Sequence, residues 1–500
     1  MADYDLAIIG GGLNGTSIAR DAAGRGLRVL LLEQGDLAGA SSAASPLIQA
    51  DPCTAGGWRA LWQAATERDI WMRTAPHLVR PVRCVMPLQD GAGPSWLLRQ
   101  LLTAHDRLAP ARLPAAGMIE LRRDPVGQAL KQPSALAFVY GAGVADVARL
   151  TIHCAVDAAE RGADIWTGAR CVRADRSDIW RLAVLNRGQR QIVSSHALVN
   201  AAGGWIASVA ETVLRLPPPK VGLRRSSQIV VRRLFDHDGV YVFRTGDGRV
   251  VHAVPFERDF TLVGAVEQEF AGDPAMVSAS SLEVAYLQDV ANRYFRAQLQ
   301  PSDVLHRLAA VHVAGAGDER TEHDGFVDLQ RGHGEAPLLT MFGGTTTTAR
   351  RRAEAGMAAL ASFLPMPEPW TDSWTAEAPL PGGNIPAVDV GGFVATARRR
   401  WPFLAETTIR RMVEAYGTRI ENLLDGARVP DDLGPMLGAD LSAREVGYLI
   451  GQQWARFADD VIWRRSRLGL TMPARDRDRL ERFMKTRTHV SGDRAARGDG

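Results

Sequence analysis

The sequence has few of the features that mark specialised classes of protein. It contains only four cysteines in 500 residues. Cys53, Cys84, Cys154 and Cys171 are scattered, with no CxxC pair and no metal-binding spacing. Such cysteines are typical of packing residues in a reduced, cytoplasmic protein. We therefore expect no metal site.

The charge balance and the short hydrophobic runs argue against a nucleic-acid-binding, a membrane-spanning or a secreted protein. Lys and Arg number 59 against 56 Asp and Glu, a formal net charge of +3, which gives no indication of nucleic-acid binding. No stretch approaches the roughly 20 apolar residues of a membrane span, and the first apolar run is too short for a signal peptide. We expect a cytoplasmic protein whose length predicts two or three domains.

A short pattern at the N-terminus is the most informative feature. An apolar strand, Leu6 to Ile9, runs into the motif Gly10-x-Gly12-x-x-Gly15, and a helix-like segment follows. A second apolar strand starts at Val29 and ends at Glu33. This order of strand, glycine turn, helix, strand and acid predicts a dinucleotide-binding unit.

Each part of this unit has a physical role. Gly10 permits a tight turn, Gly12 lets the backbone approach a pyrophosphate, and Gly15 lets the helix pack closely on the strand. The unpaired N–H groups at the start of the helix stabilise the pyrophosphate. The carboxylate of Glu33 can accept hydrogen bonds from the adenosine ribose.

The rest of the chain suggests an interrupted nucleotide domain followed by a helical one. A strand ending in Asn200-Ala-Ala-Gly203 again brings bare backbone close to the same cofactor. Residues 227–264 are rich in strands separated by turn signals and predict an inserted antiparallel sheet. A Pro-rich linker, 365–381, precedes a helical tail.

Many further segments match one known family. They are residues 5–15, 21–27, 32–38, 41–42, 75–78, 199–205, 335–339, 342–344, 380–383 and 454–465. Over nearly its whole length the chain resembles the FAD-dependent, quinone-linked glycerol-3-phosphate dehydrogenases of bacteria and mitochondria. The segment 454–465 is specific to that family and not to Rossmann proteins at large.

The resemblance implies an α/β fold with a Rossmann-type FAD-binding domain of the glutathione-reductase and D-amino-acid-oxidase type. An antiparallel β substrate domain would be interleaved with it. Within residues 1–376, the FAD parts would span about 1–80, 145–222 and 325–364, and the substrate parts about 81–144 and 223–324. A C-terminal α-helical cap would cover 377–500, with a polar frayed tail from about 486.

The resemblance also assigns residues to FAD. The expected cofactor-binding residues are Gly10, Gly12, Leu13, Asn14, Gly15, Glu33, Gln34, Ser41, Ser42, Val172, Ala202, Gly203, Trp205, Gly343, Gly344, Thr345 and Thr346. The Gly343-Gly344 turn would lie under the isoalloxazine.

The chain departs from the family where the family does its chemistry. The run Ser-Lys-Leu-Ile-His-Gly-Gly-x-Arg-Tyr is replaced by residues 45–54, which lack the lysine, histidine, arginine and tyrosine. The candidate base histidine is Gln228, which cannot take a proton from a hydroxyl. Two arginine positions hold His312 and His323, mostly neutral at pH 7, whereas a phosphomonoester is usually held by forked arginines.

The candidate catalytic residues are therefore His312, His323, Gln228 and Arg225. The two histidines either form a new acid–base or anion-binding pair or are ordinary loop residues. Arg225 either replaces a lost phosphate contact or is solvated. His252 lies where the family pattern is apolar, and it either faces the flavin or is a partly exposed strand residue.

These observations predict a FAD-dependent oxidoreductase that transfers hydride from a small polar alcohol or amine to flavin N5. Its electrons would pass to quinone or another acceptor. A glycerol-3-phosphate dehydrogenase with a rewired site and a non-catalytic flavin-binding protein are the alternatives. A homodimer is left open, as is peripheral attachment to the inner face of the cytoplasmic membrane. The clusters 398–401 and 463–467 are either membrane contacts or a solvated basic face.

Overall fold

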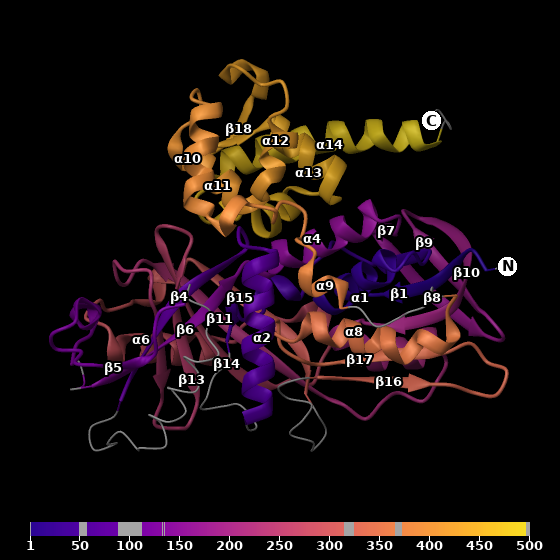
Figure 1. The fold of residues 1–500 in the computed structure, drawn as a ribbon, viewed down its shortest axis with the longest axis horizontal. Coiled ribbons are helices and arrows are strands. Elements are labelled where there is room, and N and C mark those ends of the chain that lie inside the picture. The colour runs from indigo at the N-terminus through magenta and orange to yellow at the C-terminus, as the bar shows by residue number, and fades with distance from the viewer. Residues whose placement is uncertain are drawn as a thin grey trace.

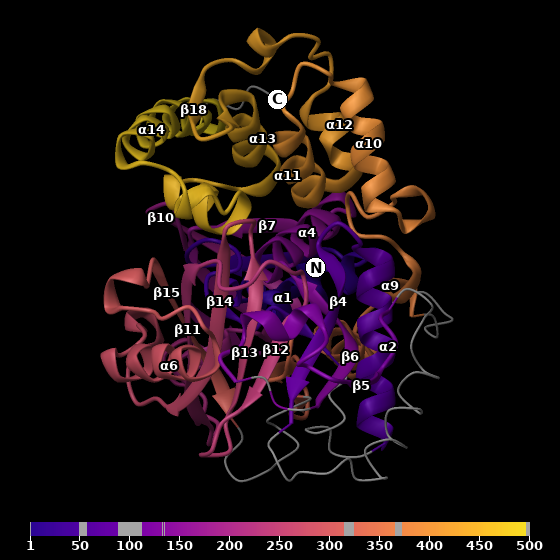
Figure 2. The same cartoon turned by 90° about the vertical axis from the view of Figure 1, so that its left-hand side faces the viewer.

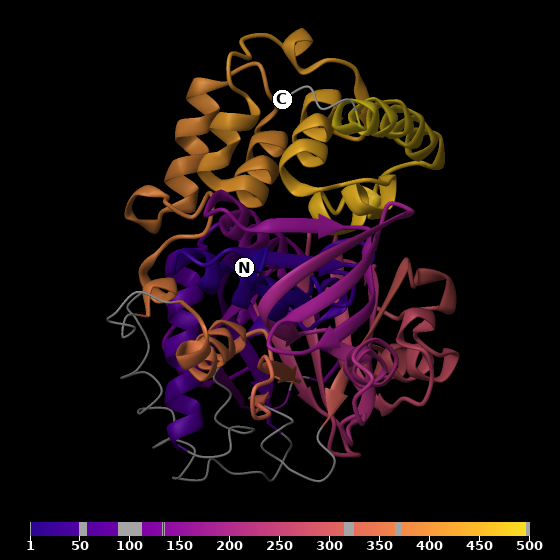
Figure 3. The same cartoon turned by 90° about the vertical axis from the view of Figure 1, so that its right-hand side faces the viewer.

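A computed structural model of the chain shows two large sheets side by side and a helical unit stacked on one end of them (Figure 1). The structure describes residues 2–49, 58–88, 113–132, 134, 136–314, 325–365 and 373–496. The three views agree that the C-terminal helices sit above both sheets (Figures 1 to 3).

The first sheet carries the N-terminal motif. Its strand order is β16-β17-β10-β1-β2-β7, and the β8–β9 hairpin extends from β10. The strands are β1 (Tyr4–Ile9), β2 (Val29–Glu33), β7 (Asp164–Thr167), β8 (Ala169–Arg176), β9 (Trp180–Asn186), β10 (Gln189–Asn200), β16 (Phe326–Gln330) and β17 (Leu338–Phe342). From β17 through β10, β1 and β2 to β7 all neighbours are parallel.

Burial on both faces explains why β1 reads as an unbroken apolar run. Leu6 and Ile8 pack with the core that includes Ile18 and Met357, whereas Ala7 and Ile9 enter a second core around Trp180. The helices α1 (Leu13–Gly24), α4 (Val147–Glu160) and α8 (Ala349–Leu360) cover the first of these faces. Helix α1 lies between α4 and α8, and its alanines allow the close approach.

The second sheet is built mainly from antiparallel pairs. Its order is β15-β11-β14-β13-β12-β4-β6-β3, with β5 paired to β6. The strands are β3 (Leu47–Ile48), β4 (Val79–Pro87), β5 (Gly117–Ile119), β6 (Ala137–Ala145), β11 (Gly222–Arg232), β12 (Val240–Arg244), β13 (Val250–Phe256), β14 (Phe260–Glu269) and β15 (His306–Ala314). Helix α6 (Ser281–Tyr294) covers one face, and it starts with a capping box formed by Ser280 and Glu283.

Two details of this sheet differ from the sequence-based expectation. Strand β3 falls within the segment expected to be wholly FAD-binding, yet it pairs with β6 in the second sheet. Strands β12 and β4 are parallel neighbours in a sheet expected to be antiparallel. Both pairings join segments that are far apart in the chain, so no local pattern could indicate them.

The remaining helices build the C-terminal unit and the connections. They are α2 (Trp58–Thr74), α5 (Ile206–Ser208), α9 (Trp374–Glu377), α10 (Val390–Arg400), α11 (Glu406–Tyr416), α12 (Ile420–Leu423), α13 (Ala443–Gln453) and α14 (Ala474–Ala496). A small hairpin joins β18 (Met436–Gly438) to β19 (Leu441–Ser442). Helix α14 continues through most of the tail expected to be frayed, because its sequence holds no proline and is rich in helix-forming arginine.

Arginines of the 463–467 cluster attach the helical cap to the first sheet. Arg464 and Arg465 both bind the carboxylate of Asp36, just beyond β2. Arg467 binds Asp146 at 2.8 Å, at the start of α4. These side chains are therefore held between the cap and the first sheet, and both interpretations of this cluster, as a membrane contact and as a solvated basic face, are wrong. Trp401 of the other cluster is buried in the cap.

None of the helices in the described segments is both long and apolar enough to cross a membrane.

Candidate functional site

The turn between β1 and α1 is closely packed. Gly10 has a φ of +115°, and a Cβ placed on it would lie 2.5 Å from the Ala201 carbonyl oxygen. A Cβ on Gly15 would lie 1.9 Å from the Gly10 carbonyl oxygen. No other residue type fits either position without moving the backbone. The glycines thus fix the start of the helix against the end of the strand.

The N-terminus of α1 has the properties of an anion site. Its N-cap, Gly12, provides no side-chain cap, and a Cβ there would meet only the Ser41 hydroxyl oxygen, at 3.3 Å. The Leu13 N–H donates to that hydroxyl at 3.1 Å. This uncapped first turn, approached by backbone alone, fits a pyrophosphate group.

Glu33 closes the same end of the sheet. Its Oε2 accepts from the Gly11 N–H and its Oε1 from the Gly35 N–H, each at 2.7 Å. Burial raises the pKa of Glu33, although both N–H donors act in the opposite direction. Each oxygen keeps a further lone pair that a ribose hydroxyl can use. Gln34, the next residue, is exposed.

A second glycine-containing turn follows β10. The side chain of Asn200 holds it, accepting from the Ala202 N–H at 3.3 Å and donating to the Ile206 carbonyl at 3.1 Å. Gly203 has a φ of +56° and begins the short 3-10 turn Gly203–Trp205. Val172 lies on β8, which packs against β2, and its side chain is 40% exposed.

The turn after β17 approaches the first glycine motif. Gly343 and Gly344 both have positive φ, and the Gly343 carbonyl accepts from Asn14 Nδ2 at 3.3 Å. Arg352 of α8 reaches this point as well and donates to Asn14 Oδ1 at 2.8 Å and to the Thr345 carbonyl at 3.1 Å. Thr346 is buried at the start of the same helix. Sequence reasoning missed Arg352, because nothing distinguished it from its neighbours Arg350 and Arg351.

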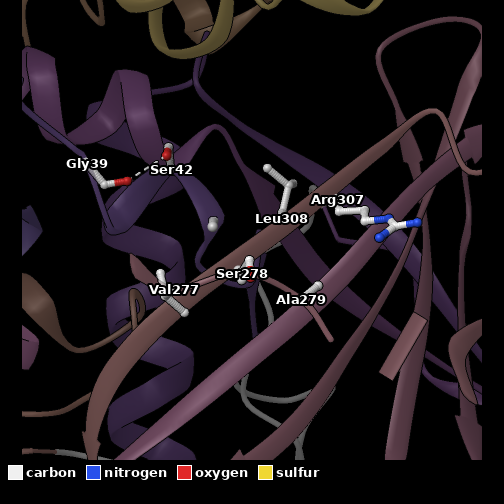
Figure 4. A pocket seen from close by; sticks show the side chains of 9 residues that line it. Gly39, Ser42, Val277, Ser278, Ala279, Arg307 and Leu308 are labelled. Carbon is white, nitrogen blue, oxygen red and sulfur yellow. Dashed lines mark hydrogen bonds between the residues drawn. The ribbon is translucent and has the colours of Figure 1, made fainter. Parts of the chain in front are cut away.

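A cavity of about 350 Å³ lies where the two sheets meet. It is lined by Gly39, Ser42, Ala43, Val277, Ser278, Ala279, Arg307, Leu308 and Ala309. Figure 4 shows Ser42 on one side, where its hydroxyl donates to the Gly39 carbonyl at 2.8 Å. The guanidinium of Arg307 extends away from Ser42 and Val277.

A family model described as FAD dependent oxidoreductase matches residues 5–350. The chain belongs to this family. It is 38% identical to a glycerol-3-phosphate dehydrogenase of Pseudomonas aeruginosa, over 97% of this chain and 95% of that protein. It is 35% identical to a D-erythritol 1-phosphate dehydrogenase of Brucella abortus, over 93% and 94%.

A solved structure shares the fold. The X-ray structure of the glycerol-3-phosphate dehydrogenase of Bacillus halodurans complexed with FAD matches with a TM-score of 0.76 and 21% identity, covering 97% of this chain and 90% of that chain. The protein is thus a FAD-dependent dehydrogenase of the glycerol-3-phosphate dehydrogenase type. The predictions of family, fold class, enzymatic character and cofactor are confirmed.

The residues that would hold FAD in this member of the FAD dependent oxidoreductase family remain a proposal. We propose that the uncapped turn of α1 and Glu33 bind the adenosine diphosphate half. Ser41, Ala202-Gly203 and Gly343-Gly344 would approach the rest of the cofactor through short side chains and backbone.

The candidate catalytic residues have different surroundings from those expected. Arg225 forms an ion pair with Glu283 of α6, at 2.8 Å. His312 lies 3.6 Å from the Glu267 carboxylate, and both side chains are partly exposed. Gln228 is buried, and its Nε2 donates to the Ala43 carbonyl at 2.7 Å. His323 and residues 50–57 lie outside the described residues, so the predicted pairing of His312 with His323 stays a prediction.

Replacing Glu33 by alanine tests the proposed adenosine site. We expect the dissociation constant for FAD to rise about 10- to 100-fold, because two backbone N–H groups and the ribose lose their acceptor. Titration of the apoprotein with FAD, followed by flavin fluorescence, measures this. Glu211→Ala, which removes an exposed carboxylate from the helical turn Val209–Val213, should leave the constant unchanged. Equal affinity in both variants would remove Glu33 from the site.

Proposed function

We propose that the enzyme oxidises a small polar alcohol or amine that carries no phosphate group. FAD, when bound, accepts the hydride and its two electrons. The observation that carries the proposal is the pairing of substrate-side cations with carboxylates of the same domain. Glu267 lies near both His312 and Arg224, at 3.6 and 3.9 Å. Arg225 is bound to Glu283 of α6, on the face of the sheet opposite the FAD-binding part.

A phosphomonoester would meet unfavourable charge here. It carries nearly two negative charges at neutral pH and needs unpaired, forked donors. Arg225 could serve only by leaving Glu283, a carboxylate that is 4% exposed and would keep only its two hydrogen bonds from Ser280. Glu267 would repel a phosphate placed beside His312. A hydroxylated, uncharged substrate would neither require Arg225 to leave Glu283 nor be repelled by Glu267.

Oxidation of a phosphorylated polyol is the second candidate. The relatives act, by name, on glycerol 3-phosphate and on D-erythritol 1-phosphate. In addition, Arg307 lines the cavity between the sheets and provides one cation there. Its guanidinium points away from the Ser42 side, which is why we place this candidate second.

Anaerobic reduction of the holoenzyme separates the two candidates. We expect glycerol, erythritol or a related uncharged alcohol or amine to bleach the oxidised flavin band, and glycerol 3-phosphate to leave it unchanged. Arg307→Met should then have no effect on the rate of bleaching. Rapid bleaching by glycerol 3-phosphate or erythritol 1-phosphate, lost in Arg307→Met, would establish the second candidate and overturn the first.

We further propose a quinone as electron acceptor and a position at the inner face of the cytoplasmic membrane. The support is the similarity to an E. coli protein named aerobic glycerol-3-phosphate dehydrogenase, at 33% identity over 97% of this chain. Reoxidation of the reduced holoenzyme by a soluble ubiquinone analogue, compared with reoxidation by oxygen, tests the acceptor. A reduced enzyme that the quinone does not reoxidise would exclude it.

A further inference from the structure

His252 lies in a row of residues that crosses the second sheet. On β13, it is directly opposite Gly264 of β14 and Val242 of β12. On its other side Gly264 is opposite Gln228 of β11. The four strands are adjacent in the sheet, as Figure 2 shows. His252 and Gln228 therefore flank a glycine that provides no side chain.

The face that carries this row is directed toward the FAD-binding part. Side chains in a strand alternate between faces, so His252 shares a face with Val250 and Val254. These two belong to the apolar layer that includes Leu47, on the side of the sheet opposite α6. Gln228 on the same face reaches the Ala43 carbonyl of the FAD-binding part. Leu308, opposite Gln228, lines the cavity between the sheets.

Gly264 leaves room for the side chain of Gln228 to lie across it. A Cβ on Gly264 would lie 2.4 Å from Cγ of Gln228, so only glycine fits beneath that side chain. The Gln228 amide is therefore held over Gly264 with its N–H₂ group directed to Ala43. It leaves an oxygen acceptor, but an amide cannot take up a proton at neutral pH.

The imidazole of His252 has an unused nitrogen. Nε2 is buried and has no hydrogen-bond partner among the described residues. An unsatisfied buried polar atom costs about 1–3 kcal/mol, and such atoms are rare in native proteins. Burial also lowers the pKa of His252 to about 4, although a hydrogen bond with the Gly264 backbone acts in the opposite direction. The ring is thus neutral at physiological pH, and its unpartnered nitrogen can form a hydrogen bond with a substrate hydroxyl.

Other described histidines on this face are otherwise engaged. His306 stacks on Trp463 of the cap, with ring centroids 4.1 Å apart. His312 lies beside Glu267 and is 40% exposed. His252 alone among these three combines a buried, unpartnered nitrogen with a place beside Gln228.

We propose that His252 is the catalytic base of this enzyme. Its Nε2 accepts the hydroxyl proton of the substrate while the carbon that bears the hydroxyl gives up hydride to FAD. The O–H and C–H bonds break, the C=O bond forms, the proton stays on His252, and both electrons leave with the hydride. This role rests on the proposed function only in that the substrate is an alcohol, with or without a phosphate.

The test compares His252→Gln with His237→Gln in the holoenzyme. His237 is in the same sheet domain but bonds to Tyr241, at 3.0 Å, on the α6 side. With whichever alcohol bleaches the wild-type flavin, His252→Gln should slow anaerobic flavin reduction at least about 100-fold. The affinity for a matching ketone, such as dihydroxyacetone, read from the flavin spectrum, should change less than about threefold, since a proton acceptor is used only in the reaction. A wild-type rate in His252→Gln overturns the proposal.

A second measurement does not depend on turnover. In holoenzyme labelled with ¹⁵N-histidine, the signal missing from His252→Gln identifies the ring, and its nitrogens should show a neutral imidazole at pH 7. Addition of glycerol or dihydroxyacetone should shift this signal and leave that of His237 in place. If no alcohol bleaches the wild-type flavin, the proposed function fails, while this shift still supports His252 as a substrate contact. An unperturbed or protonated His252 ring overturns the base assignment even where alcohols are oxidised.

Discussion

Replacing Gly15 by alanine should produce a protein that purifies without FAD. The added methyl would lie 1.9 Å from the Gly10 carbonyl oxygen, well inside contact distance. Gly10 has little room to move toward Ala201, because the two backbones are so close that a Cβ on Gly10 would lie 2.5 Å from the Ala201 carbonyl oxygen. The start of α1 must therefore shift away from β1. Because the N–H groups of this turn are proposed to bind the pyrophosphate, the affinity for FAD should fall at least about 100-fold, roughly 2.7 kcal/mol.

The ratio of flavin to protein absorbance and a FAD titration measure this effect. The matched control is Gly447→Ala in the middle of α13, where nothing lies within 4 Å of the added methyl. Alanine favours the helix by up to about 1 kcal/mol over glycine, so this variant should keep full FAD content. A yellow Gly15→Ala protein with wild-type stoichiometry would show that α1 does not bind the pyrophosphate as proposed.

The second large effect is expected in the cap. Glu445 is fully buried, and it accepts hydrogen bonds from Arg411, at 2.7 and 2.8 Å, and from the Tyr416 hydroxyl, at 2.6 Å. Burial by itself lowers the pKa of Arg411, but the carboxylates of Glu445 and Asp440 raise it well above its ordinary value. The guanidinium is therefore charged and depends on these neighbours.

Glu445→Gln should lower the stability of the cap by about 3 kcal/mol, because Arg411 keeps its charge and loses its main buried partner. In urea, the midpoint of unfolding should fall by about 1 M or more, as read by circular dichroism and by tryptophan fluorescence. The control is Glu406→Gln, which removes the partner of Arg398 at the surface, where both side chains are about half exposed. That pair should contribute less than about 1 kcal/mol. Similar midpoints in the two variants would mean that the buried pair does not stabilise the cap.

The FAD-binding unit could be predicted because its signals are local. The glycines of the motif, the apolar strand before them and Glu33 lie within 30 residues of one another, and the close backbone approach requires glycine at Gly10 and Gly15. Helix α4 likewise begins at a local signal, where the Asp146 side chain accepts from the Arg149 N–H at 3.1 Å. Local caps and periodicity carry this information without tertiary context.

The same reasoning could not assign partners to charged side chains. The arginines of 463–467 gave the pattern of a membrane-facing cluster, yet the fold brings Asp36 and Asp146 to them from more than 300 residues away. Arg225 was a candidate for phosphate binding until α6 placed Glu283 beside it. A charge has the same appearance in sequence whether it meets solvent, a ligand or a distant carboxylate.

The sequence by itself therefore determined that this protein is a FAD-dependent dehydrogenase of the glycerol-3-phosphate dehydrogenase type. Only the tertiary structure decided which cations are already paired and which side chains face the FAD-binding part. It also decided that His252 lies beside Gln228 across Gly264. The physical reason is that neighbouring residues determine the conformation of a turn or the start of a helix. Side-chain pairing and desolvation instead depend on segments that meet only when the sheets form.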